Sequence, residues 1–122
     1  MNDSKRTKVP NIAIIGAGNL GVAIGKGLAT HLGAESIWLC RRHLSKIEHL
    51  AQEGFQLSSQ LAEVATEMTH LILCVQPQQM SDVLVEIAPV LDAKKQVVIS
   101  TLTGVDIAKI EAQLPEGVPV IR

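Results

Sequence analysis

Residues 11–33 read NIAIIGAGNLGVAIGKGLATHLG, an apolar run followed by a glycine-rich turn and then a stretch of helical periodicity. The spacing of Gly16, Gly18 and Gly21 has a specific physical use in strand-to-helix turns. The first glycine permits a tight turn, the second lets the backbone approach a pyrophosphate, and the third lets the helix pack close to the strand. The start of such a helix offers unpaired N–H groups and the positive end of its dipole to phosphates. The stretch therefore predicts a dinucleotide-binding turn.

Apolar runs of strand length alternate with helix-like stretches along the rest of the chain. The expected strands are 12–15, 36–40, 55–57, 71–75, 96–100 and 118–121. The first expected helix ends near Leu32, with Gly33 as its stop. The other expected helices are 45–53, 60–68, 80–91 and one capped by Asp106. Pro89 should kink or end the helix over 80–91. Because the strands are apolar on both faces, we predict an α/β fold, a doubly wound (Rossmann) parallel sheet of about six strands in the order 3-2-1-4-5-6, with helices on both faces.

Helical spacing also predicts which side chains of the first two helices face the sheet. They are Leu20, Ala23, Ile24 and Leu28 in the first helix, and Ile47, Leu50 and Ala51 in the second.

Length and composition limit the class of protein. The chain has 122 residues, 47% of them hydrophobic, with one Phe, one Trp and no Tyr, so that Leu, Ile, Val and Ala must build the core of one domain. We expect a polar N-terminal tail over 1–10 and a dinucleotide-binding domain over 11–122. A formal net charge of −1 disfavours nucleic acid as a partner. The tail lacks the apolar region of a signal peptide and no run reaches membrane-span length, so a cytoplasmic location is expected.

The residues after the second strand bear on the choice of dinucleotide. An NAD-binding chain carries Asp or Glu there for the ribose hydroxyls, but this sequence has Cys40-Arg41-Arg42-His43, and the next carboxylate is Glu48. A guanidinium group can bind a 2′-phosphate, which a carboxylate would repel. The sequence predicts NADP(H) in preference to NAD(H). The alternative is that Arg41 and Arg42 simply begin a solvated loop.

Two further strand ends are candidate cofactor contacts, because ligands of such sheets lie across the carboxyl ends of the strands. Cys74-Val75-Gln76-Pro77 ends the fourth strand and could flank the nicotinamide ribose, or could be only a strand stopped by proline. Ser100-Thr101-Leu102-Thr103-Gly104 ends the fifth strand, and its hydroxyls could reach the ribose or the amide, or could cap the helix at Asp106.

The cysteines and histidines give no catalytic or metal-binding pattern. Cys40 and Cys74 are expected on strands separated by the first strand, about 9–10 Å apart, which is beyond disulfide reach. We interpret them as small buried residues. His31, His43, His49 and His70 lack metal-ligand spacing and are expected in surface or capping roles. No catalytic residue is predicted from spacing.

The chain from Asn11 to Arg122 resembles the N-terminal domain of pyrroline-5-carboxylate reductases. The motifs that carry the resemblance are IAIIGAGNLG at 12–21, IWL at 37–39, CVQP at 74–77, VVIS at 97–100, GV at 104–105 and VIR at 120–122. The resemblance implies reduction of 1-pyrroline-5-carboxylate to proline by hydride transfer from NAD(P)H, the last step of proline biosynthesis. A stand-alone NADP(H)-binding or sensing module, or the cofactor domain of a related reductase with another substrate, are the alternatives.

The resemblance also implies which residues contact the cofactor. They are Gly16, Ala17, Gly18, Asn19, Leu20, Arg41, Arg42, Cys74, Val75, Gln76, Pro77, Thr101, Leu102 and Thr103. The family usually has Lys where Gln76 stands, and small residues at Leu102 and Thr103. The family continues past the position of Arg122 into a helical domain that forms the dimer and binds the imine substrate. We therefore expect this chain to bind the cofactor but to turn over little or no substrate.

Overall fold

The structure is a computed structural model that describes residues 10–102 and 104–122. Thr103 and residues 1–9 of the expected tail lie outside the described residues. Within those ranges, the strands β1 (Ile12–Ile15), β2 (Ile37–Cys40), β3 (Gln56–Ser58), β4 (His70–Leu73), β5 (Val97–Ser100) and β6 (Val120–Ile121) form one sheet. Its order is β3-β2-β1-β4-β5-β6 and every neighbouring pair is parallel. The predicted fold class and strand order are confirmed.

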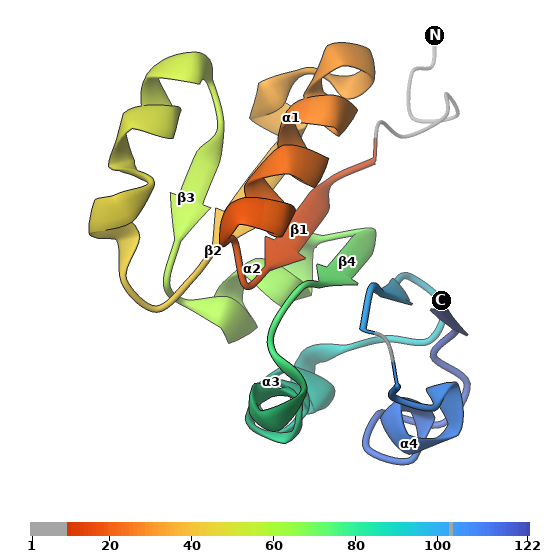
Figure 1. The fold of residues 1–122 in the computed structure, drawn as a ribbon. Helices are drawn as coiled ribbons and strands as arrows, with labels where there is room; N and C mark the ends of the chain where they lie inside the picture. The colour runs from red at the N-terminus through yellow and green to blue at the C-terminus, as the bar shows by residue number, and fades with distance from the viewer. Residues whose placement is uncertain (1–9, 103) are drawn as a thin grey trace, which may run out of the picture.

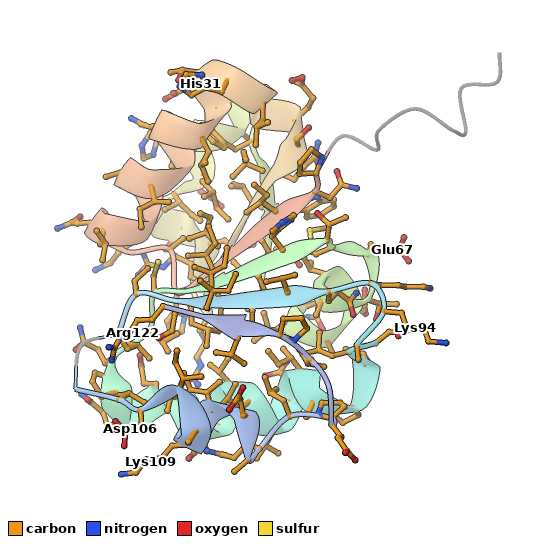
Figure 2. The ribbon with its side chains drawn as sticks, turned by 90° about the vertical axis from the view of Figure 1, so that its right-hand side faces the viewer. His31, Glu67, Lys94, Asp106, Lys109 and Arg122 are labelled. Atoms are coloured by element: carbon orange, nitrogen blue, oxygen red, sulfur yellow. The ribbon has the colours of Figure 1, made fainter. Side chains whose placement is uncertain are left out.

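Helices cover both faces of this sheet. The α-helices are α1 (Asn19–Leu32), α2 (Leu61–Glu67), α3 (Met80–Ile87) and α4 (Ile107–Glu111), and the 3₁₀ turns are η2 (Ala34–Ser36), η3 (Leu44–Lys46), η4 (Glu48–Glu53), η5 (Pro77–Gln79) and η6 (Ala88–Val90). Figure 1 shows how the red and orange part of the chain runs from β1 directly into α1. In the turned view of Figure 2, α1 lies above the sheet, and α3 and α4 lie below it.

The sheet separates two apolar clusters because successive side chains of a strand point to opposite faces. In β1, Ile12 and Ile14 pack toward α1 and the turn η4, whereas Ala13 and Ile15 pack toward α2, α3 and α4. All four side chains are buried, and β4 and β5 alternate in the same way. The central strands are therefore enclosed on both faces, as expected for a parallel sheet.

The expected helix over 45–53 is wrong. The structure has the two 3₁₀ turns η3 and η4, separated at Ile47 (φ −124°, ψ 7°). Ile47 and Leu50 are buried as expected, but Ala51 is exposed. A spacing of three residues between the two buried side chains suits a 3₁₀ turn, in which residues i and i+3 share one side.

The expected inner face of α1 needs correction as well. Leu20 is 56% exposed and Ala23 is exposed, whereas Ile24 and Leu28 are half-buried as expected. The buried residues of this helix are Gly21 and Gly25. A Cβ at Gly25 would lie 3.0 Å from Leu39 Cδ2, so α1 approaches the sheet along its glycines and the larger apolar residues pack to either side.

Several predicted helix ends are confirmed. Gly33 ends α1 with a φ of 89° and donates its N–H to Ala29. The helix expected over 80–91 ends as an α-helix at Ile87, and Pro89 lies in the 3₁₀ turn that follows. Asp106 does precede α4, but its side chain forms no capping hydrogen bond, contrary to the expectation.

Candidate functional site

The register of the sheet brings the predicted strand ends together. Ile15 lies opposite Cys40 of β2 on one side and opposite Leu73 of β4 on the other. The residues that follow these three positions therefore meet at the carboxyl edge of the sheet. Figure 2 shows this edge on the side of Arg122, away from Glu67 and Lys94.

Glycine is required at position 16, where the chain turns out of β1. Gly16 has a φ of 90°, and a Cβ there would lie 2.7 Å from Val75 Cγ1 and 2.9 Å from the Val75 nitrogen. The turn is held from β2, because the N–H groups of Gly16 and Ala17 both donate to the Cys40 carbonyl, at 2.9 and 3.0 Å. The tight turn predicted for the first glycine is present.

The other two glycines differ in what surrounds them. A Cβ at Gly18 would meet no atom within 4 Å, so the space beside this residue is open. A Cβ at Gly21 would lie 2.9 Å from Ile14 Cγ2 and 3.0 Å from the Gly16 carbonyl oxygen, because α1 packs tightly on β1 at this point. These surroundings fit close approach of a ligand at Gly18 and close packing of the helix at Gly21.

The first turn of α1 presents unpaired donors. The first hydrogen bond of the helix runs from the Val22 N–H to the Gly18 carbonyl, at 2.9 Å. Within residues 10–102 and 104–122, the N–H groups of Asn19, Leu20 and Gly21 have no backbone or side-chain acceptor. Unpaired N–H groups at a helix start, together with the helix dipole, form an anion-binding site.

A cleft of about 530 Å³ opens at this edge. Its walls are the glycine turn, the segment from Cys40 to His43 after β2, Ser58 and Ser59 at the end of β3, and the segment from Cys74 to Gln76 after β4. A further wall is one face of η5 and α3, made by Gln79, Asp82, Val83 and Glu86. The volume falls within the range of small-molecule sites, about 300–1,000 Å³.

The structure gathers most of the predicted site residues in this cleft. Those that line it are Gly16, Ala17, Gly18, Arg41, Arg42, Cys74, Val75 and Gln76. Asn19, Leu20, Pro77, Thr101 and Leu102 do not line it, and Thr103 lies outside the described residues.

Thr101 and Leu102, the two described site residues predicted after β5, have side chains that contact other parts of the protein. The Thr101 hydroxyl donates to the Leu73 carbonyl at 2.8 Å, so it ties β5 to the end of β4. Leu102 is 7% exposed, with its side chain in the apolar cluster on the side of α2, α3 and α4. Its N–H donates to the Ser100 hydroxyl at 3.1 Å.

The two arginines after β2 have different surroundings. Arg41 is half-buried, and its Nη1 donates to the Ala17 carbonyl at 3.2 Å. Arg42 is exposed, and its side chain makes no hydrogen bond within the described part of the chain. His43 is exposed beside them and lines the same cleft.

Sequence reasoning missed several lining residues, although two signals could have found them. Ser58 and Ser59 follow the third apolar strand, so the strand-end rule that selected Arg41 also applies to them. Gln79, Asp82, Val83 and Glu86 recur at helical spacing in η5 and α3, the first helical segments after β4. That spacing places them on one helix face near the same edge.

Both cysteines of the cleft are free thiols. Cys40 packs toward α3 and Cys74 packs toward α1, so the two lie on opposite faces of the sheet. As the predicted strand order requires, β1 lies between β2, which ends at Cys40, and β4, which Cys74 follows. Burial raises the pKa of Cys40 to about 12. Burial also raises the pKa of Cys74, and a hydrogen bond with Thr101 acts in the opposite direction.

No helix within the described residues is long and apolar enough to cross a membrane. The same part of the chain has no group of three His, Cys, Asp or Glu side chains arranged to hold a metal ion.

Comparison with known proteins gives a family match for most of the domain. Residues 11–104 match the family model described as "NADP oxidoreductase coenzyme F420-dependent". Pyrroline-5-carboxylate reductase 2 of Dictyostelium discoideum is 39% identical over 125 aligned positions, which cover 98% of this chain and 41% of that protein. The resemblance inferred from the sequence motifs is confirmed.

Solved structures agree with the fold. A pyrroline-5-carboxylate reductase from Coxiella burnetii superimposes with a TM-score of 0.84 at 27% identity, over 93% of this chain and 43% of that one. The Plasmodium falciparum pyrroline carboxylate reductase, solved with NADP bound, gives a TM-score of 0.75 at 20% identity, over 91% of this chain and 40% of that one. The chain thus spans about two-fifths of the length of these relatives.

Proposed function

Because the chain belongs to the family described as "NADP oxidoreductase coenzyme F420-dependent", we propose that its cleft binds NADP(H) as the cofactor domain of a reductase. The observation that carries this proposal is the helix start at Asn19, Leu20 and Gly21. Its unpaired N–H groups directly follow Gly18, which lines the cleft and has open space in place of a side chain. A pyrophosphate approaching Gly18 would accept those hydrogen bonds without meeting a side chain.

The remaining contacts follow from the walls of the cleft. We propose that Gly16, Ala17 and Gly18 border the pyrophosphate, that Asn19 and Leu20 act through their backbone N–H groups, and that Arg41, Arg42, Cys74, Val75 and Gln76 border the rest of the dinucleotide. Contact of Pro77, Thr101, Leu102 and Thr103 with the cofactor stays a prediction, which a cofactor-bound structure would check. The bound cofactor supplies the hydride, and the protein binds and orients it.

Glycine variants test the proposed site. A Cβ at Gly18 would meet no protein atom within 4 Å, so the fold should accept valine there, yet the valine side chain would occupy the space left for the pyrophosphate. Gly18→Val should therefore abolish NADPH binding measured by calorimetry while it retains the unfolding midpoint. Gly27→Val is the matched control, because Gly27 lies in α1, which Gly18 directly precedes, also has open space beside its Cα, and does not line the cleft. Equal NADPH affinity in wild type and Gly18→Val would overturn the proposal.

We further propose a preference for NADP(H) over NAD(H). The end of β2 carries Arg41 and Arg42 at the cleft, and the first carboxylate that follows them, Glu48, does not line it. A charge-assisted hydrogen bond to the extra phosphate contributes about 1.5–3 kcal/mol, so wild type should bind NADPH roughly tenfold or more tightly than NADH. Equal affinities for the two cofactors would remove the preference and leave dinucleotide binding intact.

The reaction that the cofactor domain serves is proposed from its similarity to pyrroline-5-carboxylate reductases. We propose that the cofactor domain serves hydride transfer to 1-pyrroline-5-carboxylate, giving proline, together with a helical domain that binds the imine and forms the oligomer. The relatives are more than twice as long as the aligned part, because this chain covers only 41% of the Dictyostelium protein. The 122-residue chain should therefore bind NADPH without oxidising it when 1-pyrroline-5-carboxylate is added. Proline formation by this chain at the rate of an ordinary enzyme would contradict the division of roles.

We also propose a cytoplasmic location. Cys40 and Cys74 are both free thiols, which suits a reducing compartment. Imaging of a C-terminally tagged form in its native cell would test the location, and accumulation outside the cytoplasm would overturn it.

A further inference from the structure

Arg41 and Arg42, the two arginines after β2, are neighbours in sequence, but their side chains have different contacts in the fold. We propose that Arg41 is a positioning residue that holds the glycine turn in its binding-competent shape, whereas Arg42 is the residue that selects the phosphorylated dinucleotide. The proposal rests on the proposed function, since it assigns separate roles within that same cleft.

The contacts around Ala17 support the role of Arg41. Its N–H donates to the Cys40 carbonyl at 3.0 Å, and its own carbonyl accepts from Arg41 Nη1 at 3.2 Å. Two consecutive residues at the end of β2 thus bind both backbone polar groups of one residue in the turn. Because these bonds fix the peptide planes on either side of Ala17, they also set the direction of the chain into Gly18 and the donors of α1.

Arg41 is itself anchored. Its backbone N–H donates to the Ser58 carbonyl at 3.3 Å, and its side chain is half-buried. Ala17 is fully buried, so water has little access to that residue. Loss of the guanidinium donor would leave the Ala17 carbonyl without this partner and would loosen the turn.

The surroundings of Arg42 are different. It is exposed, it lines the cleft, and it makes no side-chain hydrogen bond among the described residues. Its guanidinium can form paired bonds to phosphate oxygens without first breaking a bond within the protein. The geometry therefore assigns the extra phosphate to Arg42, with Arg41 acting on the pyrophosphate indirectly.

Two nucleotide fragments separate these roles. ADP contains the pyrophosphate without a 2′-phosphate, and adenosine 2′-phosphate contains the 2′-phosphate without a pyrophosphate. Calorimetry of the 122-residue chain should show that Arg41→Ala weakens ADP, NADH and NADPH by a similar factor, about tenfold, and leaves adenosine 2′-phosphate within about twofold of wild type. Arg42→Ala should weaken adenosine 2′-phosphate and NADPH by about tenfold or more, with ADP and NADH unchanged.

Two further measurements separate positioning from a general loss of stability. Arg41→Lys, which keeps a charged donor, should recover most of the ADP affinity lost in Arg41→Ala, and the urea midpoint followed by Trp38 fluorescence corrects for changes in folding. Amide hydrogen exchange in the ligand-free protein should quicken at Gly16 and Ala17 in Arg41→Ala but not in Arg42→Ala, since both amides bond to the Cys40 carbonyl.

The inference is overturned if Arg41→Ala weakens adenosine 2′-phosphate and spares ADP, or if it changes neither fragment. Failure of the proposed function has a different signature, because wild type would then bind neither dinucleotide. In that case exchange at Gly16 and Ala17 still decides whether Arg41 holds the turn, and unchanged exchange there would reject its positioning role.

Discussion

Gly21 and Gly27 lie in the same helix, but Gly21 is buried and Gly27 is exposed, so an added methyl group would meet different surroundings. At Gly21 the Cβ would lie 2.9 Å from Ile14 Cγ2 and 3.0 Å from the Gly16 carbonyl oxygen, whereas at Gly27 it would meet nothing within 4 Å. We predict that Gly21→Ala destabilises the protein by about 1–3 kcal/mol because α1 must move away from β1. Gly27→Ala should stabilise it by about 0.4–1 kcal/mol through reduced freedom of the unfolded chain.

Urea unfolding followed by the fluorescence of the single tryptophan, Trp38, measures both free energies of unfolding. Gly21→Ala should also weaken NADPH binding, since the displaced Gly16 carbonyl belongs to the proposed binding turn. If Gly21→Ala were as stable as Gly27→Ala, close packing of α1 on β1 could not be the reason for glycine at this position.

Cys40 makes stability depend on pH in alkaline solution. Its pKa is raised from 9.0 to about 12 by burial, so the unfolded chain loses this thiol proton before the folded chain does. The stabilisation is complete below pH 9.0 and is lost as pH rises toward about 12. One such proton changes the free energy of unfolding by about 1.4 kcal/mol per pH unit in that interval.

The variant Cys40→Ala isolates this effect, because wild type and variant share every other ionisable group. Between pH 8 and pH 10.5, wild type should lose about 2 kcal/mol more free energy of unfolding than Cys40→Ala. Urea denaturation at a series of pH values provides the measurement. Parallel pH profiles would mean that the buried thiol ionises equally readily in the folded and unfolded chains.

At the scale of elements, the end of α2 depends on a side chain from the segment before β5. Gln96 is 2% exposed, and its Nε2 contacts the carbonyl oxygens of Ala65, Thr66 and Met68 at 3.0, 3.3 and 3.0 Å. Its Oε1 accepts from the Asp92 N–H at 2.7 Å. The Thr66 carbonyl belongs to the last turn, where a helix leaves its carbonyl groups unpaired, and Met68 follows α2 directly. The Ala65 carbonyl also accepts from the Met68 N–H at 3.3 Å.

We predict that Gln96→Met, which keeps the size of the side chain but removes its donors and acceptor, destabilises the protein by roughly 2–4 kcal/mol. Calorimetric unfolding measures this loss, and amide exchange should quicken first in α2. Gln113→Met is the control, because among the described residues the Gln113 side chain makes a single long hydrogen bond, 3.5 Å to the Lys109 carbonyl. Its free energy of unfolding should change by less than about 0.5 kcal/mol. Similar losses in both variants would contradict a specific role for Gln96.

Much of this element arrangement can be predicted from the sequence because apolar patterning determines it. The alternation of buried strands and amphipathic helices specifies a parallel sheet, and the glycine turn identifies its first strand. Patterning did not distinguish 3₁₀ turns from an α-helix around Ile47, since both bury residues spaced by three or four. Apolar patterning also predicted that Leu20 faces the sheet, because residue spacing does not reveal that α1 approaches the sheet along Gly21 and Gly25.

Sequence patterns also predict only part of the candidate site. Motifs at known strand ends find Gly16, Arg41 and Cys74, whose neighbours are determined by sheet register. The bond from Arg41 to the Ala17 carbonyl depends on a side-chain conformation that no spacing encodes. Thr101 and Leu102 also follow a strand end, yet their side chains are used by the fold, which only the packing of the whole chain reveals.

For the whole molecule, the cleft joins two parts of the chain that otherwise meet mainly across β1 and β4. The glycine turn and the ends of β2 and β3 form one side, and the segment after β4 with the face of α3 forms the other. A ligand that contacts both sides is bound only by the folded protein, so its binding free energy adds to the stability of the complete domain. Partial unfolding of either part would release it.

We therefore predict that NADPH at about 100 times its Kd adds roughly 2.7 kcal/mol to the free energy of unfolding and raises Tm by roughly 10 °C. At the same concentration NADH should raise Tm by less, and Arg42→Ala should bring the two shifts together because it removes the proposed contact with the extra phosphate. Scanning calorimetry over a series of cofactor concentrations measures Tm, and amide exchange should slow both in α1 and in α3. Slower exchange in α1 alone would show that the dinucleotide contacts only one side of the cleft.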